Sequence, residues 1–132
     1  FSHLNSEITE VLIPTSDIRK GDTLAYAPKF QANIRLRYEW PTGNNLTAYL
    51  MPDISHSSES YSDILAFNRD RINNWLIIGL SAGLQASNWT AELYFDNLTD
   101  EAAELSRNFV NDIQRATYTQ PRTIGLRFSY EL

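Results

Sequence analysis

The strongest constraint in this sequence is a strict two-residue alternation between residues 28 and 40. One parity is apolar or aromatic and comprises Phe30, Ala32, Ile34, Leu36, Tyr38 and Trp40. The other parity is polar and comprises Lys29, Gln31, Asn33, Arg35, Arg37 and Glu39. Because successive side chains of a β-strand point to opposite faces, the pattern predicts a long strand with one apolar and one polar face. A helix is excluded, because it would bring Lys29 and Arg35 into its apolar stripe.

Other segments follow the same rule. Four of them are predicted strands, at residues 45–56, 75–84, 89–96 and 123–132. A sixth segment, residues 2–11, is rich in β-forming side chains but alternates poorly. Pro52 has no amide donor, so it predicts a bulge or the outer end of its strand. The sequence therefore predicts an all-β protein with about six long antiparallel strands.

The connections between these strands alternate between short and long. Residues 41–44 and 85–88 are short and predict tight turns. The long connections are residues 12–27, 57–71 and 98–122. This order predicts an up-and-down meander with its tight turns at one end. The apolar spacing of residues 100–109 also leaves open a short helix inside the last long connection.

Composition narrows the function classes. The chain has 132 residues, 11 basic and 16 acidic side chains, and a net charge of −5, which argues against a nucleic-acid partner. It has no cysteine, so disulfides, thiolate zinc sites and cysteine nucleophiles are excluded. Its two histidines, His3 and His56, lie far apart in the sequence. With no catalytic motif either, we expect no enzyme activity, no metal site and no cofactor.

The two faces of the predicted strands need different surroundings. The polar face carries too many charges for a dry core, because each desolvated charge costs several kcal/mol, so it must face water. The apolar stripes exceed the patches that soluble monomers expose, so another layer or lipid must cover them. Strands of roughly 10 residues, aromatic residues at the stripe ends, and short turns opposite long loops all favour lipid. A soluble β-sandwich or small ligand-binding barrel remains the alternative.

Several segments resemble one family of membrane receptors. Residues 21–33 (GDTLAYAPKFQAN) resemble the GD-x-L-x-x-x-P-K start of a barrel strand in TonB-dependent outer-membrane receptors. Residues 94–101 (YFDNLTDE) resemble the NL-[FT]-D-E element of that family's penultimate strand. Residues 122–132 (RTIGLRFSYEL) resemble its closing strand, although Leu132 stands where the family most often has an aromatic residue. The polar residues 60–63 (SYSD) fit a loop after an upward strand.

This resemblance implies a fold and a function. Residues 1–132 would be a C-terminal β-barrel segment, about six strands of the wall of a 22-stranded transmembrane barrel, without the plug domain. The protein would act in the bacterial outer membrane, in active uptake of a siderophore, a cobalamin or a carbohydrate. Its partners would be outer-membrane lipid, the barrel assembly machinery, a small-molecule nutrient and, through the absent N-terminal region, the TonB complex.

The same reading predicts two sets of site residues. The residues expected to face the barrel lumen are Lys29, Arg35, Arg37, Glu92, Tyr94 and Arg127. The residues expected to bind the ligand lie in the long loops and are Glu59, Tyr61, Arg69, Arg71, Arg107, Asn108, Arg115 and Tyr118. Polar loops of this composition suit polar ligands, but solvated loops have the same composition.

Overall fold

The computed structural model describes residues 1–12, 17–111 and 113–131. These residues form strands, turns and irregular segments, and contain no helix, which confirms the predicted all-β class. None of the described residues belongs to a helix long and apolar enough to cross a membrane. The strands are β1 (Ser2–His3), β2 (Phe30–Arg35), β3 (Tyr38–Gly43), β4 (Leu46–Ser57), β5 (Ser60–Tyr61), β6 (Arg71–Ile72), β7 (Trp75–Gln85), β8 (Trp89–Asp96), β9 (Glu104–Val110), β10 (Ile113–Tyr118) and β11 (Thr123–Tyr130).

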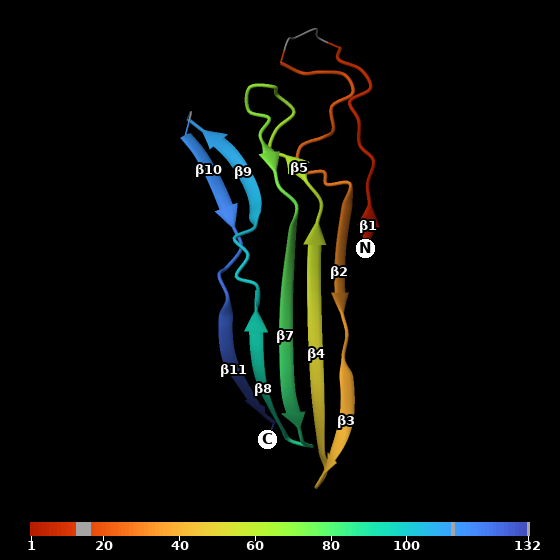
Figure 1. The fold of residues 1–132 in the computed structure, drawn as a ribbon, viewed down its shortest axis with the longest axis vertical. Helices are drawn as coiled ribbons and strands as arrows, with labels where there is room; N and C mark the ends of the chain where they lie inside the picture. The colour runs from red at the N-terminus through yellow and green to blue at the C-terminus, as the bar shows by residue number, and fades with distance from the viewer. Residues whose placement is uncertain (13–16, 112, 132) are drawn as a thin grey trace. The chain divides into compact units, whose positions relative to one another are not determined.

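The main sheet has the order β1-β2-β4-β7-β8-β11, and β3 also pairs with β4 (Figure 1). Each pair whose register is resolved is antiparallel, and neighbours in the sheet follow one another along the chain, as a meander requires. Two small sheets, β5 with β6 and β9 with β10, complete the topology of the described residues. No pairing among those residues joins β11 back to β1, so the sheet does not close into a barrel.

The chain divides into two compact units. The first, called the loop unit, comprises Phe1–Ala32, His56–Leu76 and Ala102–Thr119. The second, called the sheet unit, comprises Asn33–Ser55, Ile77–Glu101 and Gln120–Leu132. The loop unit takes in β1, β5, β6, β9 and β10, and the sheet unit takes in β3, β8, β11 and most of β4 and β7.

In the sheet unit, the observed strands agree with the alternation. β4, β7, β8 and β11 lie where strands are predicted, within two residues at each end, except that Leu132 lies outside the described residues. The register pairs apolar residues with apolar residues and polar residues with polar ones: Leu126 lies opposite Leu93, and Arg127 lies opposite Glu92. Because paired residues share a face, the alternation of each strand extends across the sheet.

The predicted strand at residues 28–40 is wrong as a single element, since the structure has β2 and β3 with a break at Leu36 and Arg37. The backbone N–H of Leu36 donates to the carbonyl of Pro52 at 3.1 Å. Pro52 has no N–H to return that bond, so the ladder is interrupted in the strand facing it. β4 itself continues through Pro52 to Ser57, so the proline is not its outer end.

Both tight turns are present, although the first is shifted by about two residues. β3 runs through Gly43, and the turn is the pair Asn44 and Asn45, with φ of 52° and 58°. Two left-handed residues between paired strands meet the requirement of a type I′ hairpin, and Asn tolerates that conformation well. Between β7 and β8 the turn lies where predicted, with the N–H of Ala86 donating to the carbonyl of Trp89 at 2.8 Å.

In the loop unit the sequence predictions were less accurate. Residues 100–109 form no helix, because Glu104–Val110 is strand β9, which pairs with β10 in a hairpin. The predicted long loop 98–122 therefore contains two strands. The predicted strand at residues 2–11 is reduced to Ser2–His3, after which the backbone bonds become irregular, as in the bond from the N–H of Ile8 to the carbonyl of Asp22. Residues 13–16 of the first long connection lie outside the described residues.

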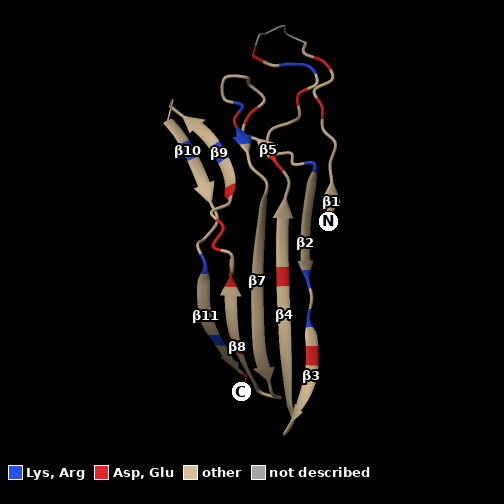
Figure 2. Cartoon of the chain, viewed as in Figure 1, with Lys and Arg blue, Asp and Glu red and all other residues tan. Residues whose placement is uncertain are grey.

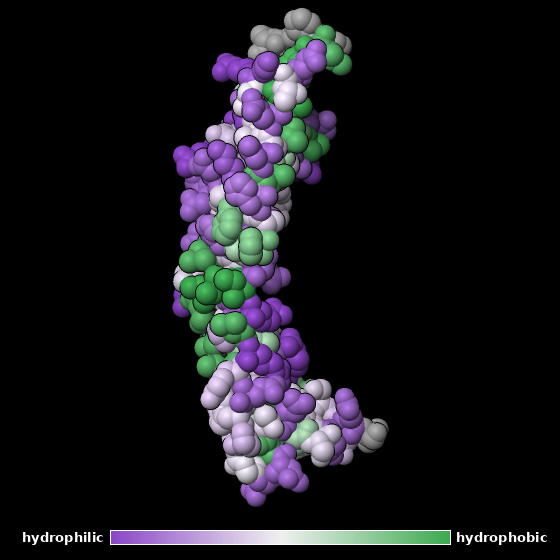
Figure 3. All heavy atoms as spheres, turned by 90° about the vertical axis from the view of Figure 1, so that its right-hand side faces the viewer, coloured by the Kyte–Doolittle hydropathy of each residue, from purple (hydrophilic) through white to green (hydrophobic). Residues whose placement is uncertain are grey.

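The apolar face of the sheet unit is uncovered. Leu36, Leu126 and Phe128 are 63%, 83% and 69% exposed. Figure 3, an edge-on view, shows hydrophobic atoms gathered on one side of the middle of the sheet and hydrophilic atoms on the other. Figure 2 shows the charged residues of β3 and β4 as isolated bands between uncharged stretches. The strands thus carry two distinct faces, and the apolar one is not packed against another layer of the described residues.

Candidate functional site

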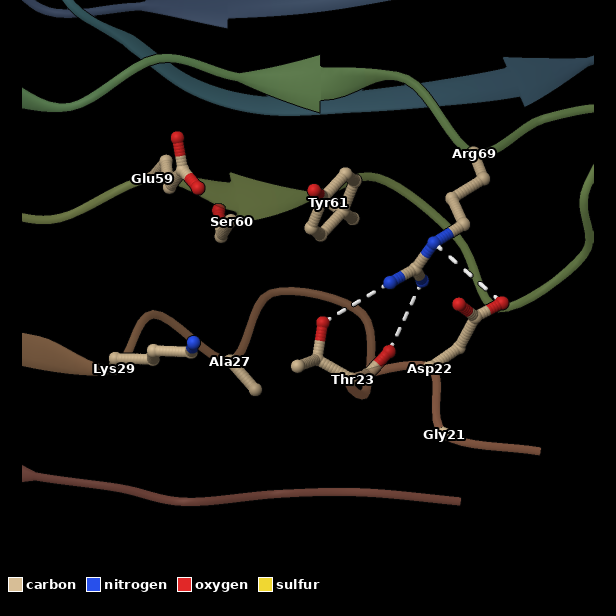
Figure 4. A pocket seen from close by; sticks show the side chains of 9 residues that line it. All are labelled: Gly21, Asp22, Thr23, Ala27, Lys29, Glu59, Ser60, Tyr61 and Arg69. Carbon is tan, nitrogen blue, oxygen red and sulfur yellow. Dashed lines mark hydrogen bonds and ion pairs between the residues drawn. The ribbon is translucent and has the colours of Figure 1, made fainter. Parts of the chain in front are cut away.

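The loop unit contains a polar cavity of about 200 Å³, called the loop cavity (Figure 4). Its lining comes from the segment before β2, from β5 and its preceding residue, and from one arginine before β6. The lining residues are Gly21, Asp22, Thr23, Ala27, Lys29, Glu59, Ser60, Tyr61 and Arg69. Three of the predicted ligand-binding residues, Glu59, Tyr61 and Arg69, are therefore brought together, and Arg71 lies beside them in β6.

Arg69 is largely committed to the protein. Its guanidinium donates to the carbonyl of Thr23 at 3.0 Å, to the hydroxyl of Thr23 at 3.0 Å and to the carbonyl of Asp63 at 2.9 Å. It also lies 3.8 Å from the carboxylate of Asp22 and 4.0 Å above the ring centroid of Tyr61. Figure 4 shows the guanidinium pointing at Thr23 and Asp22, with the ring of Tyr61 alongside. Arg69 thus fastens the cavity wall, since its donors are used within the chain.

The local sequence explains why Arg69 is held there. The carboxylate of Asp63 accepts the backbone N–H groups of Ile64 and Leu65 at 2.7 and 3.1 Å, which fixes the start of a turn. The hydroxyl of Ser62, a buried residue, donates to the carbonyl of Asn68 at 2.6 Å and closes the same turn. The segment between β5 and β6 is therefore ordered by its own side chains.

Of the other charged residues at the loop cavity, Glu59 forms an ion pair and Lys29 forms none with the described residues. Glu59 pairs with Arg71 at 2.6 Å, and both side chains are about half exposed, so the pair adds little stability. Lys29 is exposed and has no ion-pair partner in the described part of the chain. Figure 4 shows its amino group extending along the cavity. Lys29, predicted to face the lumen, thus belongs to the loop cavity of this structure.

The predicted residues of the last long connection lie on the β9–β10 hairpin. Arg107 donates to both carboxylate oxygens of Glu104, at 2.6 and 2.7 Å, and to the carboxylate of Asp70 at 3.1 Å. These hydrogen bonds, first to Glu104 and then to Asp70, raise the pKa of Arg107 above its usual range. Asn108 and Arg115 lie opposite each other in the hairpin, and Tyr118 lies opposite Glu104. None of these four residues lines the loop cavity.

The sheet unit carries a second cluster, on its polar face. The hydroxyl of Tyr49 donates to the carboxylate of Glu92 at 2.7 Å, and Arg127 pairs with the same carboxylate at 2.6 Å. Arg37 lies 3.9 Å above the ring centroid of Tyr49, and Arg127 lies 5.2 Å from that of Tyr94. Four of the six residues predicted to face the lumen, Arg37, Glu92, Tyr94 and Arg127, are thus connected by one network, whereas Arg35 and Lys29 are not part of it.

Tyr49 is the residue of this network that the sequence predictions missed. It is only 3% exposed, and its phenol is held by the buried carboxylate of Glu92. A Cβ atom added at Gly83 would overlap the ring of Tyr49, and one added at Gly125 would overlap the ring of Tyr94. The glycines in β7 and β11 therefore make room for tyrosines on neighbouring strands. The alternation of β4 could have placed Tyr49 on the polar face, because Tyr49 lies two residues after Thr47 on the side of the strand opposite Ala48.

The described residues hold no group of three or more His, Asp, Glu or Cys side chains arranged to bind a metal ion. Glu59, Arg69 and Arg107 instead form ion pairs within the chain. The arrangement can hold polar solutes in the loop cavity and can keep a charged face in water.

A scan against protein-family models finds no match to this chain, and searches of curated proteins and of solved structures find none either.

Proposed function

We propose that this chain is part of the barrel wall of a TonB-dependent receptor in the bacterial outer membrane. In this proposal the strands of the sheet unit belong to a 22-stranded transmembrane barrel. The role is transport rather than catalysis, namely active uptake of a scarce nutrient such as a siderophore, a cobalamin or a carbohydrate. The proposal rests on the motifs at residues 21–33, 94–101 and 122–132 together with the two-faced sheet.

The observation that carries the proposal is the contrast between the two sides of β11. Ile124, Leu126 and Phe128 form an apolar row that is more than half exposed. On the other side, Arg127 reaches across to Glu92 in a hydrogen-bonded polar network. Transmembrane barrels require this combination, with apolar residues toward lipid and polar residues toward the lumen. A soluble sandwich would have to cover the apolar row, and the described residues do not cover it.

The proposed partners follow from these surfaces and from the family resemblance. The apolar face would contact outer-membrane lipid, and β11 would be the strand read by the barrel assembly machinery. Energy would come from the TonB complex. The residues that line the loop cavity come mostly from the long connections, which in this proposal would meet the external solute.

Cell fractionation tests this proposal. The protein is expressed in a Gram-negative bacterium and its distribution between the aqueous fraction, the inner membrane and the outer membrane is measured. We expect it in the outer membrane, where it should need detergent for extraction and migrate differently on gels before and after heating. Recovery from the aqueous fraction, with a cooperative thermal unfolding transition in the absence of detergent, would contradict the proposal and support the soluble alternative.

A further inference from the structure

The loop unit contains a second cavity, called the neutral cavity because its lining has no unpaired charged side chain. It has a volume of about 180 Å³. Its lining includes Tyr26, Gln31, Ser58, Asn73, Trp75 and Glu104. Its volume is well below the ~300–1,000 Å³ of pockets for drug-sized ligands, so it can take only a small molecule or one unit of a larger one.

The neutral cavity has no free charge. Glu104 is its one charged lining residue, and both carboxylate oxygens are already bound by Arg107 at 2.6 and 2.7 Å. Arg107 also donates to the carboxylate of Asp70 at 3.1 Å, but Asp70 does not line the cavity, so the charge at the cavity wall is that of the bidentate Glu104–Arg107 pair. The cavity therefore differs from the loop cavity, whose lining includes Lys29, Asp22 and Glu59. An ionic solute would lose its hydration here without gaining a counter-charge.

Several hydrogen-bonding groups that line the neutral cavity are available to a ligand. The side-chain amides of Gln31 and Asn73 are exposed and have no partner in the part of the chain that the structure describes. Each amide has one acceptor oxygen and two N–H donors. The hydroxyl of Ser58 accepts the N–H of Phe30 at 3.1 Å and keeps its own proton for a ligand. These groups suit a ligand whose hydroxyls both donate and accept.

An apolar platform lies beside these polar groups. Trp75 is half-buried at the cavity, and Pro28, Ile72 and Leu105 are further apolar residues of its lining. Binding sites commonly combine such a surface with a few directional polar groups. A sugar ring matches both, because it has flat patches of C–H bonds and a rim of hydroxyl groups. We propose that the neutral cavity binds one ring of an uncharged saccharide.

The backbone conformation of Tyr26 indicates a preformed binding site. Tyr26 has a φ of 52°, in the left-handed region that bulky residues rarely adopt. Its N–H donates to the carbonyl of Tyr61 at 2.8 Å, and its hydroxyl donates to the carbonyl of Arg107. Strained residues held by surrounding contacts are concentrated at ligand sites. Tyr26 is thus fixed at the cavity before any ligand arrives, as preorganised binding requires.

Saccharide binding at this cavity is independent of the membrane role. Only its interpretation, that the saccharide is the imported solute, depends on the proposed function. That interpretation would select carbohydrate from the three proposed nutrient classes.

Calorimetric titration of the detergent-purified protein tests the inference. The probes are glucose, galactose, mannose and N-acetylglucosamine, with glucuronate and glucosamine as charged counterparts. We expect saturable binding of at least one neutral sugar, and at least tenfold weaker binding of the charged analogues. Asn73→Ala and Trp75→Ala should each weaken that binding tenfold or more, because they remove the open amide and the platform.

Asn74→Ala is the matched control, since this neighbouring asparagine does not line the cavity. It should bind the sugar as the unmodified protein does, and Gln31→Ala provides a second, exposed lining variant should Trp75→Ala fail to fold. Failure of all four neutral sugars to bind, or equal losses in Asn73→Ala and Asn74→Ala, would overturn the inference. Fractionation reports on the proposed function separately, so outer-membrane protein without sugar binding would leave that function standing.

Discussion

The two faces of the sheet unit are made by the same strands but are stabilised in different ways. On the polar face, Tyr49 and Glu92 are 3% and 8% exposed and are hydrogen-bonded to each other. On the apolar face, Leu126 and Phe128 project from the sheet with little packing against the chain. The polar face therefore satisfies most of its interactions within the protein, whereas the apolar face depends on its surroundings.

This difference indicates where the stability of the sheet is decided. Interactions within the polar face join groups of the chain itself, such as the hydroxyl of Tyr49 and the carboxylate of Glu92. The apolar face gains free energy only when its side chains leave water, by about 25 cal/mol per Å² of apolar surface. A sheet of this kind therefore gains stability when its apolar face leaves water, whether against lipid or against another protein layer.

Leu126→Arg should have the largest effect of three substitutions that compare the two faces. At the middle of a bilayer, arginine on the lipid face of a barrel costs about 2–4 kcal/mol. We expect the amount of folded protein in the outer membrane to fall sharply, as measured by fractionation and by unfolding in urea. The matched control is Ser129→Arg in the same strand on the polar face, which should assemble normally. Normal assembly of Leu126→Arg would show that this face does not meet lipid.

Glu92→Ala should have an intermediate effect. The substitution leaves the buried hydroxyl of Tyr49 without its acceptor, which costs about 1–3 kcal/mol. Urea unfolding of the refolded protein measures the loss, and Glu92→Gln should recover part of it because an amide oxygen can still accept the bond. Glu39→Ala is the control, since its pair with Arg37 is solvent-exposed and should contribute about 0–1 kcal/mol. Equal losses in both alanine variants would contradict a specific role for Glu92.

Arg127→Ala should have the smallest effect, although Arg127 binds the same carboxylate. Its side chain is 67% exposed whereas that of Glu92 is 9% exposed, so water screens the pair from the Arg127 side and we expect a loss of about 1 kcal/mol. Its removal also opens Glu92 to water, so the carboxylate is not left in a dry environment. The measurement is the same urea titration, repeated at high salt, where the difference from the unmodified protein should shrink. A loss well above about 1 kcal/mol would indicate that the polar face is not hydrated.

The regular strands could be predicted from the sequence because their signal is local. β8 and β11 follow the parity of their own residues, and the register then places Leu93 against Leu126. The break at Leu36 was not predictable in this way, since it depends on Pro52 in another strand. The β9–β10 hairpin was missed for a related reason. Leu105 and Phe109 are four residues apart, as on a helix face, and pairing with β10 determines that they form a strand.

The candidate site was predictable in its location but not in its chemistry. Polar loops indicated where Glu59, Tyr61 and Arg69 would gather, and they do lie at one cavity. Composition could not show that Arg69 is bound to Thr23, because these residues are 46 positions apart. Nor could it indicate the neutral cavity, where the open groups are the amides of Gln31 and Asn73 rather than charged side chains.

The close approach of Tyr49 to Gly83 has a consequence for how this sequence can evolve. Any side chain at position 83 would meet the tyrosine ring, so that glycine can change only after position 49 has become smaller. The same reciprocal restriction links Tyr94 with Gly125. Across descendants of this gene, substitutions at each pair of positions should therefore appear together, as correlated changes between neighbouring strands.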